Sequence, residues 1–172
     1  TGRKPEISPR PLPLVRAAWA EVERLRNSTA RLTMAGGAVI EMELLTEEAP
    51  ASVARFARLA GSGYYNGLTI HRIVPNFVIQ GGSPGANEYV GDGAFMRDEV
   101  GPLSHARGTL GISTRGRDTG DAQFFLNLVD NPRLDHDYTV FARVVSGLEA
   151  ADRILECDVV AKVEIMPRPG RP

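Results

Sequence analysis

The chain has 172 residues, of which 42% are hydrophobic and 24% charged, and its formal net charge is −1. These values are typical of one globular domain, and the small net charge argues against a molecule drawn as a whole to nucleic acid or to an anionic membrane. No run approaches the ~20 apolar residues that a membrane-spanning helix needs. Cys157 is the only cysteine, which excludes an intramolecular disulfide. We expect it to be a small core residue, because its neighbours are apolar.

Residues 1–28 are predicted to form a basic, proline-rich segment followed by an amphipathic helix. Four prolines up to position 13 indicate an extended linker. The stretch Leu14–Arg26 then shows apolar residues at helical spacing, namely Val15, Ala18, Trp19, Val22 and Leu25. This apolar stripe must pack on the rest of the chain, on another copy or on a neighbouring domain. Residues 1–33 carry a net charge of +4 and the remainder −5, which we interpret as a solvated tail, with contact to an acidic partner as the alternative.

Short strand signals dominate the middle of the chain. A hairpin is expected from residues 30–34 and 38–45, with Ile40, Met42 and Leu44 facing inward. A helix should begin near Pro50 and end at Gly61. A further helix should begin at the capping box from Ser146 to Glu149, and its core face is expected to include Leu148, Ala151 and Leu155. The last strand is expected at residues 158–165. Many short strands with two such helices favour a closed antiparallel barrel.

Residues 69–82 hold the most informative pattern. Arg72, Phe77 and Gln80 lie at offsets of five and eight residues in an apolar, β-branched run that bends at Pro75-Asn76. Side chains alternate along a strand, which predicts two faces, one with Ile70 and Arg72 and the other with Phe77, Ile79 and Gly81. A guanidinium beside a phenyl ring and a carboxamide indicates a functional site, because such a group fits an apolar core poorly.

This run resembles the signature of the cyclophilins, the cyclosporin-binding family of peptidyl-prolyl cis-trans isomerases. The resemblance continues, in the same order, at Gly108–Ser113, Asp121–Leu126 and Leu134–Phe141. It implies a mainly β fold, a closed eight-stranded antiparallel barrel capped by two α-helices, to which the N-terminal helix is an addition. We therefore divide the chain into residues 1–28, a cyclophilin-like isomerase domain at 29–166 and a tail at 167–172. The compact 131–135 segment looks like that of bacterial members.

The resemblance implies an isomerase that rotates X-Pro bonds in polypeptides and so assists protein folding. Rotation about a peptide bond has a barrier of ~18–20 kcal/mol, because amide resonance is lost. As the bond twists, the prolyl nitrogen becomes pyramidal and basic, so a donor aimed at it binds the twisted state better than either planar state. Arginine suits this role, because it is always protonated and carries five N–H donors. Arg72 is the expected donor.

The resemblance also implies the residues around Arg72. Gln80 would bond the peptide carbonyl and steer Arg72. The apolar slot for the proline ring would be lined by Phe77, Val78, Phe125, Leu134 and Tyr138. Residues before the proline would lie against Ser113, Thr114 and Gln123. Four positions depart from the common pattern, with Val78 in place of Met, Thr114 in place of Asn, Tyr138 in place of His and Arg133 in place of Trp. The last change implies weak or no cyclosporin binding.

No cofactor is expected, and His71, His105 and His136 lack the spacing of a metal site. His71 should be a satisfied structural residue. The expected partners are proline-containing polypeptides, not nucleic acid or membrane, and the protein is expected to be a monomer or part of a longer chain. A cytoplasmic location is expected, with the periplasm as the alternative, because the chain begins at Thr1 and a leader could have been removed. Two other functions stay open, a proline-peptide binding or scaffold module with incidental turnover, and a folding-factor domain that docks through the Trp19 helix.

Overall fold

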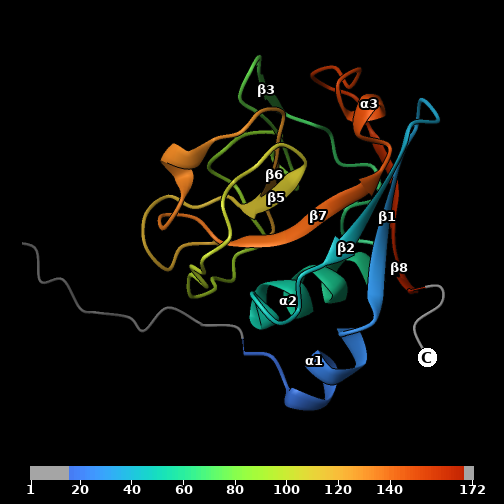
Figure 1. The fold of residues 1–172 in the computed structure, drawn as a ribbon. Helices are drawn as coiled ribbons and strands as arrows, with labels where there is room; N and C mark the ends of the chain where they lie inside the picture. The colour runs from blue at the N-terminus through green and yellow to red at the C-terminus, as the bar shows by residue number, and fades with distance from the viewer. Residues whose placement is uncertain (1–15, 169–172) are drawn as a thin grey trace, which may run out of the picture.

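The structure is a computed structural model that describes residues 16–168. Its framework is one eight-stranded sheet with the strand order β3-β4-β6-β5-β7-β2-β1-β8, in which every neighbouring pair is antiparallel. The strands are β1 (Ser28–Met34), β2 (Val39–Leu44), β3 (Arg72–Val74), β4 (Val78–Gly81), β5 (Thr109–Ile112), β6 (Phe124–Asn127), β7 (Val140–Ser146) and β8 (Val160–Pro167). The helices are α1 (Trp19–Leu25), α2 (Pro50–Gly61) and α3 (Leu148–Ala151), with a short 3-10 turn at Pro132–Leu134. Figure 1 shows the sheet curling over α2, with α1 beyond it.

The predicted mainly β, eight-stranded antiparallel architecture is confirmed, with one correction. The strand ladder is an open, curled half-barrel, because β3 and β8 are edge strands that do not pair with each other. The segments next to them meet at a single bridge between Thr69 and Val159, supported by Ile70 N–H donating to Asp158 O at 2.9 Å. This bridge lies before β3, which begins at Arg72, and is therefore not part of the strand ladder.

The core lies between the sheet and α2. Alternate residues of β2 are buried, and the predicted inward face of Ile40, Met42 and Leu44 is confirmed. The ring of Phe56 on α2 contacts those of Tyr65, Phe124 and Phe141, with centroids 5.1–6.1 Å apart.

The helix α2 begins at the predicted proline. Its first turn lacks a cap from its own N-cap residue, and the carboxylate of Glu99 accepts the N–H groups of Ala51 and Ser52 at 2.9 and 2.8 Å. A carboxylate at this end also interacts favourably with the helix dipole. A residue 47 positions away from Ser52 therefore fixes the start of the helix.

The helix α1 is shorter than the sequence predicts. It covers Trp19–Leu25, and the predicted helical residues Leu14 and Val15 lie outside the described residues. Val22 and Leu25 are buried, and Arg58 on α2 pairs with Glu21 at 3.1 Å, so the helix packs against α2 and Leu25 joins the core. Trp19 is 67% exposed, with the guanidinium of Arg26 over its ring at 5.5 Å. Among residues 16–168, no helix has the length and apolarity needed to cross a membrane.

The region around α3 corrects four predictions. The capping box is absent, because Gly147 is the N-cap residue with φ of 87° and no side chain caps the helix. A Cβ at Gly147 would approach Val39 O to 2.1 Å, so only glycine fits there. Leu155 is 68% exposed, and Ile154 is buried instead, because the helix ends at Ala151 and its periodicity ends with it. Cys157 is exposed in a turn, and the last strand begins two residues later than expected.

Candidate active site

The hairpin of β3 and β4 carries the predicted site residues. Arg72 lies opposite Gln80 in the ladder, and the chain turns between Val74 and Phe77, whose N–H donates to Val74 O at 3.1 Å. Val78 and Gln80 line a groove, whereas the intervening Ile79 belongs to the core. Alternation therefore holds within β4 itself.

The faces predicted outside β4 are wrong for two residues. Ile70 is in the core, although the sequence pattern placed it with Arg72, because it precedes β3 and is not part of the regular strand. Phe77 lines the groove together with Arg72, although the pattern placed it with Ile79. Phe77 lies in the turn, where the period of two does not apply.

The groove has a volume of about 320 Å³ and is formed by β3, β4, β6, the residues that follow β5 and the segment around Leu134. Nine of the predicted residues line it, namely Arg72, Phe77, Val78, Gln80, Ser113, Thr114, Phe125, Leu134 and Tyr138. Gln123 is fully buried behind the wall, and the guanidinium of Arg133 lies over the Phe77 ring at 4.2 Å. The structure thus brings all eleven predicted residues to one groove or its immediate support.

A chain of polar contacts fixes Arg72. Its Nη1 donates to Gln80 Oε1 at 3.3 Å, and Gln80 Nε2 donates to Gln123 Oε1 at 3.1 Å. On its other side, Nε of Arg72 lies 3.1 Å from Glu88 Oε1. Within residues 16–168, Nη2 has no such partner and remains a donor for a ligand in the groove. The guanidinium is therefore oriented before any ligand binds.

The apolar part of the groove is built around Phe125. Its ring stacks on His105 at 5.6 Å and meets Tyr138 edge-on at 5.7 Å. It lies close over Gly111, where a Cβ would approach the ring to 2.3 Å. Neighbouring Phe124 points to the opposite face and packs in the core, so one ring of the pair is core and the other is groove wall, as the sequence predicts.

A buried polar layer behind Phe125 was not anticipated from the sequence. Burial lowers the pKa of His105, and its neutral ring bonds with Tyr138 O through Nε2 at 3.2 Å. Its Nδ1 lies 3.3 Å from the amide Nδ2 of Asn127, which identifies Nδ1 as the acceptor and Nε2–H as the donor. Asn127 Oδ1 in turn accepts from Asn131 Nδ2 at 2.8 Å, and that amide also donates to Phe77 O at 3.1 Å.

This layer holds the 131–135 segment against the hairpin. The sequence signal for this layer was weak, because one asparagine at the end of an apolar strand does not show where its amide points.

The prediction for His71 is wrong. This side chain is buried, but neither ring nitrogen has a hydrogen-bond partner among residues 16–168. Burial lowers its pKa, so the ring stays neutral without the partner that we expected.

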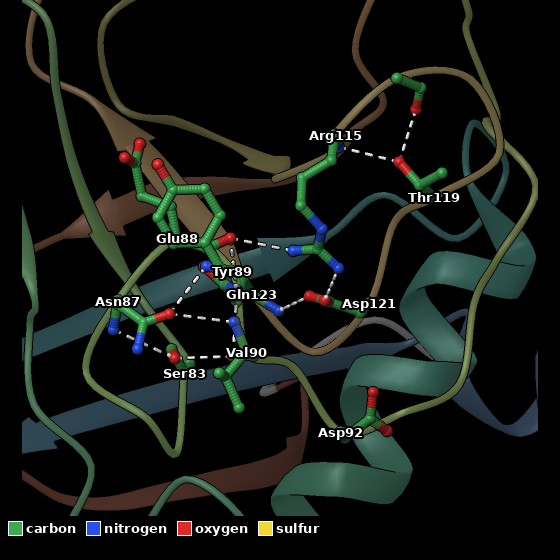
Figure 2. Close-up of polar contacts among 12 residues, drawn as sticks. Ser83, Asn87, Glu88, Tyr89, Val90, Asp92, Arg115, Thr119, Asp121 and Gln123 are labelled. Atoms are coloured by element: carbon green, nitrogen blue, oxygen red, sulfur yellow. Dashed lines mark hydrogen bonds and ion pairs between the residues drawn. The ribbon is translucent and has the colours of Figure 1, made fainter.

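Three further groove residues, Glu88, Tyr89 and Arg115, were also missed. Glu88 and Tyr89 lie in the glycine-rich segment after β4, which the sequence indicated only as an irregular loop. Figure 2 shows that this loop is held by a network of side chains. An acid next to an aromatic residue in such a loop was the available signal.

Three comparisons with known proteins agree. The family model described as "Cyclophilin type peptidyl-prolyl cis-trans isomerase/CLD" matches residues 29–169. Peptidyl-prolyl cis-trans isomerase B of Bacillus subtilis is 40% identical over 139 residues, which are 80% of this chain and 97% of the relative. A peptidyl-prolyl cis-trans isomerase of Helicobacter pylori is 42% identical over 128 residues, 72% of this chain and 78% of the relative.

The fold comparison gives the same family. The crystal structure of a cyclophilin-type peptidyl-prolyl cis-trans isomerase of Cryptosporidium parvum matches with a TM-score of 0.76 and 25% identity, covering 83% of this chain and 99% of that one. The same protein in the presence of the dipeptide Ala-Pro matches with a TM-score of 0.75 and 24% identity, covering 81% of this chain and 99% of that one.

Proposed function

The chain belongs to the cyclophilin-type peptidyl-prolyl cis-trans isomerases, and we propose that Arg72 drives its reaction by donating a hydrogen bond to the prolyl nitrogen of the twisted X-Pro bond. The observation that carries this proposal is the fixed guanidinium of Arg72 beside the apolar slot of Phe77, Val78, Phe125 and Leu134. A planar amide nitrogen is a poor acceptor, whereas the pyramidal nitrogen of the twisted bond accepts well. The bond therefore forms mainly in the transition state.

The other groove residues position the peptide. The proline ring occupies the apolar slot, with Tyr138 at one side of Phe125. Gln80 holds Arg72 and lies where it can contact the carbonyl of the twisting bond. Residues before the proline lie against Ser113 and Thr114, and buried Gln123 fixes the amide of Gln80. The substrate is an exposed X-Pro bond of a polypeptide, so the enzyme assists folding steps that wait for proline isomerisation.

The size of the Arg72 effect follows from hydrogen-bond energies. A hydrogen bond from a charged donor is worth ~1.5–3 kcal/mol, which corresponds to about one to two decades in rate. Exclusion of water and the fit of the slot to the twisted conformer supply the remainder. Loss of Arg72 should therefore reduce kcat/KM by roughly 10- to 100-fold at least, while stability changes little because the side chain is partly exposed.

The test is two-dimensional NMR exchange on an Ala-Pro peptide with wild type, Arg72→Ala and the matched control Arg143→Ala. Arg143 is a surface arginine on β7 that pairs with Glu43. We expect wild type and Arg143→Ala to accelerate exchange equally and Arg72→Ala to lose most of the acceleration. If no protein accelerates exchange while the peptide shows binding shifts, the groove is a proline-peptide recognition module instead.

We also propose weak cyclosporin binding. Arg133 places a charged guanidinium over Phe77 at a position where cyclosporin-sensitive members have the flat indole of Trp. Inhibition of peptide exchange by cyclosporin measures this directly. We expect Arg133→Trp to be inhibited at concentrations at least about tenfold lower than wild type, and equal inhibition of the two would contradict the proposal.

A further inference from the structure

The groove wall formed by residues 82–93 is held in place by side chains of Arg115 and Gln123 and by its own Ser83 (Figure 2). The backbone carbonyl of Glu88 accepts hydrogen bonds from Arg115 Nη1 at 2.9 Å and Gln123 Nε2 at 3.3 Å. Ser83 Oγ donates to Val90 O at 2.6 Å. Behind the loop, Asp92 pairs with Arg55 of α2, and both side chains are largely buried. The position of Glu88 is therefore set by the fold rather than by chance on a free loop.

Of the two carboxylates next to this part of the groove, Asp121 and Glu88, only that of Glu88 is accessible to a ligand. Arg115 also lines the groove, but it is 2.7 Å from the carboxylate of Asp121, which is buried. That pair is neutral as a unit. Glu88 is 46% exposed at its side chain and contacts Arg72 through one oxygen, Oε1, at 3.1 Å. A carboxylate has about four acceptor sites on its two oxygens, so Glu88 can accept a second cation without releasing Arg72.

Tyr89 adds an aromatic surface next to this acid. Its side chain lines the same groove and is 78% exposed, which is unusual for a large aromatic residue without a role in packing. The face of a tyrosine ring attracts a cation, and the aliphatic stem of lysine or arginine can pack along the ring while its charged end stays in water. An acid and an exposed ring side by side therefore suit a basic side chain.

The placement of this pair along the groove indicates which substrate residue it meets. Glu88 lies by Arg72 and Gln123, at the Gln80 end of β4, whereas the proline slot begins at Phe77 at the other end of that strand. Under the proposed function, residues before the proline lie at the Gln80 end. Neighbouring side chains of an extended peptide face opposite sides, so only one of the two residues before the proline can face the loop.

We propose that Glu88 and Tyr89 form a specificity subsite for a lysine or arginine two residues before the proline. This inference rests on the proposed isomerase function and names the substrate class that the site prefers. Glu88 acts on substrate choice through charge, and Tyr89 supports the same side chain through its ring. The preference should weaken as ionic strength rises, because the charges are partly exposed.

The test measures kcat/KM by NMR exchange on three peptides that end in Ala-Pro-Phe and differ only in a preceding Lys, Gln or Glu. For wild type we expect the order Lys, Gln, Glu, with steps of about threefold, the size typical of exposed charge pairs. In Glu88→Gln the Lys-to-Glu ratio should fall close to one, and in Glu88→Lys it should invert. Glu47→Gln is the matched control, since it removes an exposed acid that pairs with Arg26 at the C-terminal end of α1, outside the groove, and should keep the wild-type ratio.

Four results would overturn the subsite as proposed. Equal rates for the three peptides, with the Gln peptide still accelerated by wild type, would refute it while leaving the isomerase function intact. An equal loss on all three peptides in Glu88→Gln would make Glu88 a positioning residue for Arg72 and not a selector. If wild type accelerates none of the peptides, the proposed function fails and the subsite with it. A preference that appears only in a further peptide, with Lys in place of the Ala directly before the proline, would refute the assigned position.

Discussion

The two faces of strands β4 and β6 are equally buried but built for different purposes. On one face Ile79, Phe124 and Leu126 pack into the core with α2 behind them. On the other, Val78, Gln80 and Phe125 form the floor of the groove. Phe124 is 4% exposed and Phe125 5%, so burial alone does not distinguish a core residue from a groove wall.

The difference between the faces lies in what stands opposite each side chain. Phe124 meets other rings, whereas Phe125 meets a glycine, a histidine and a space that a ligand can fill. The groove face is also backed by polar contacts, including the Gln80–Gln123 bond and the Asn127 amide. Each strand thus contributes to the core on one side and to the proposed active-site groove on the other, and mutations can separate the two contributions.

The largest expected effects come from removing the ring of Phe124 in one variant and the ring of Phe125 in another. Phe124→Ala should lower the free energy of unfolding by about 3–5 kcal/mol, because it leaves a cavity in the closed core. Phe125→Ala should cost clearly less, since water can enter the groove, but should reduce kcat/KM by more than about tenfold. Urea unfolding and NMR exchange measure the two quantities. Equal loss of stability in both variants would contradict the distinction between the faces.

A second pair tests the neighbouring positions on β4. Gln80→Leu removes the amide that holds Arg72 at 3.3 Å and should reduce kcat/KM about tenfold, the value of roughly one hydrogen bond. Ile79→Val, on the core face, should cost about 0.5–1.5 kcal/mol of stability and leave exchange rates unchanged. A variant at Gln80 that keeps full activity would remove the amide from the proposed mechanism.

We also expect the stability of the fold to fall in mild acid, because a histidine is buried behind the groove face. Burial lowers the pKa of His105 below its usual 6.5, so this ring is neutral in the folded protein and gains a proton more readily when unfolded. The unfolded state therefore binds more protons as the pH falls below about 6.5, and stability is lost there, by at most about 1.4 kcal/mol per pH unit for one group. Protonation also removes the Nδ1 acceptor used by Asn127.

Urea unfolding between pH 7.5 and 5 checks this slope. His71 has its pKa lowered by burial as well, so each histidine should be replaced separately to divide the effect. With His105→Gln we expect a smaller slope, and chemical shifts of Tyr138 and Phe125 that no longer change with pH. A slope that is unaltered by both replacements would assign the acid sensitivity to other groups.

The smallest expected effect concerns Tyr138. Its ring meets Phe125 and His105 edge-on, with centroids 5.7 and 6.3 Å apart, and this packing does not need the hydroxyl. Tyr138→Phe should therefore change kcat/KM by less than about twofold, whereas Tyr138→Leu should reduce it several-fold by removing the flat wall. A large loss in Tyr138→Phe would show that the hydroxyl contacts the substrate.

Several features of this protein could be predicted from the sequence because they depend on local pattern. The alternation in β2, the proline at the start of α2 and the opposite orientation of Phe124 and Phe125 follow from strand and helix geometry. The four sequence blocks also indicated the groove residues together with Arg72. Each of these signals lies within one element or one short run.

Other features were decided only when distant segments met. Glu99 caps α2 from a loop, Asn127 and His105 form a buried layer behind the groove, and Glu88 reaches Arg72 because Arg115 and Gln123 hold its backbone. Where an element ended early, at α3 and in the turn before Phe77, the local period ended too, so the predicted core position of Leu155 and the strand face predicted for Phe77 were wrong. A sequence pattern fixes which side of an element a residue takes, but its partner across the fold depends on how the elements pack.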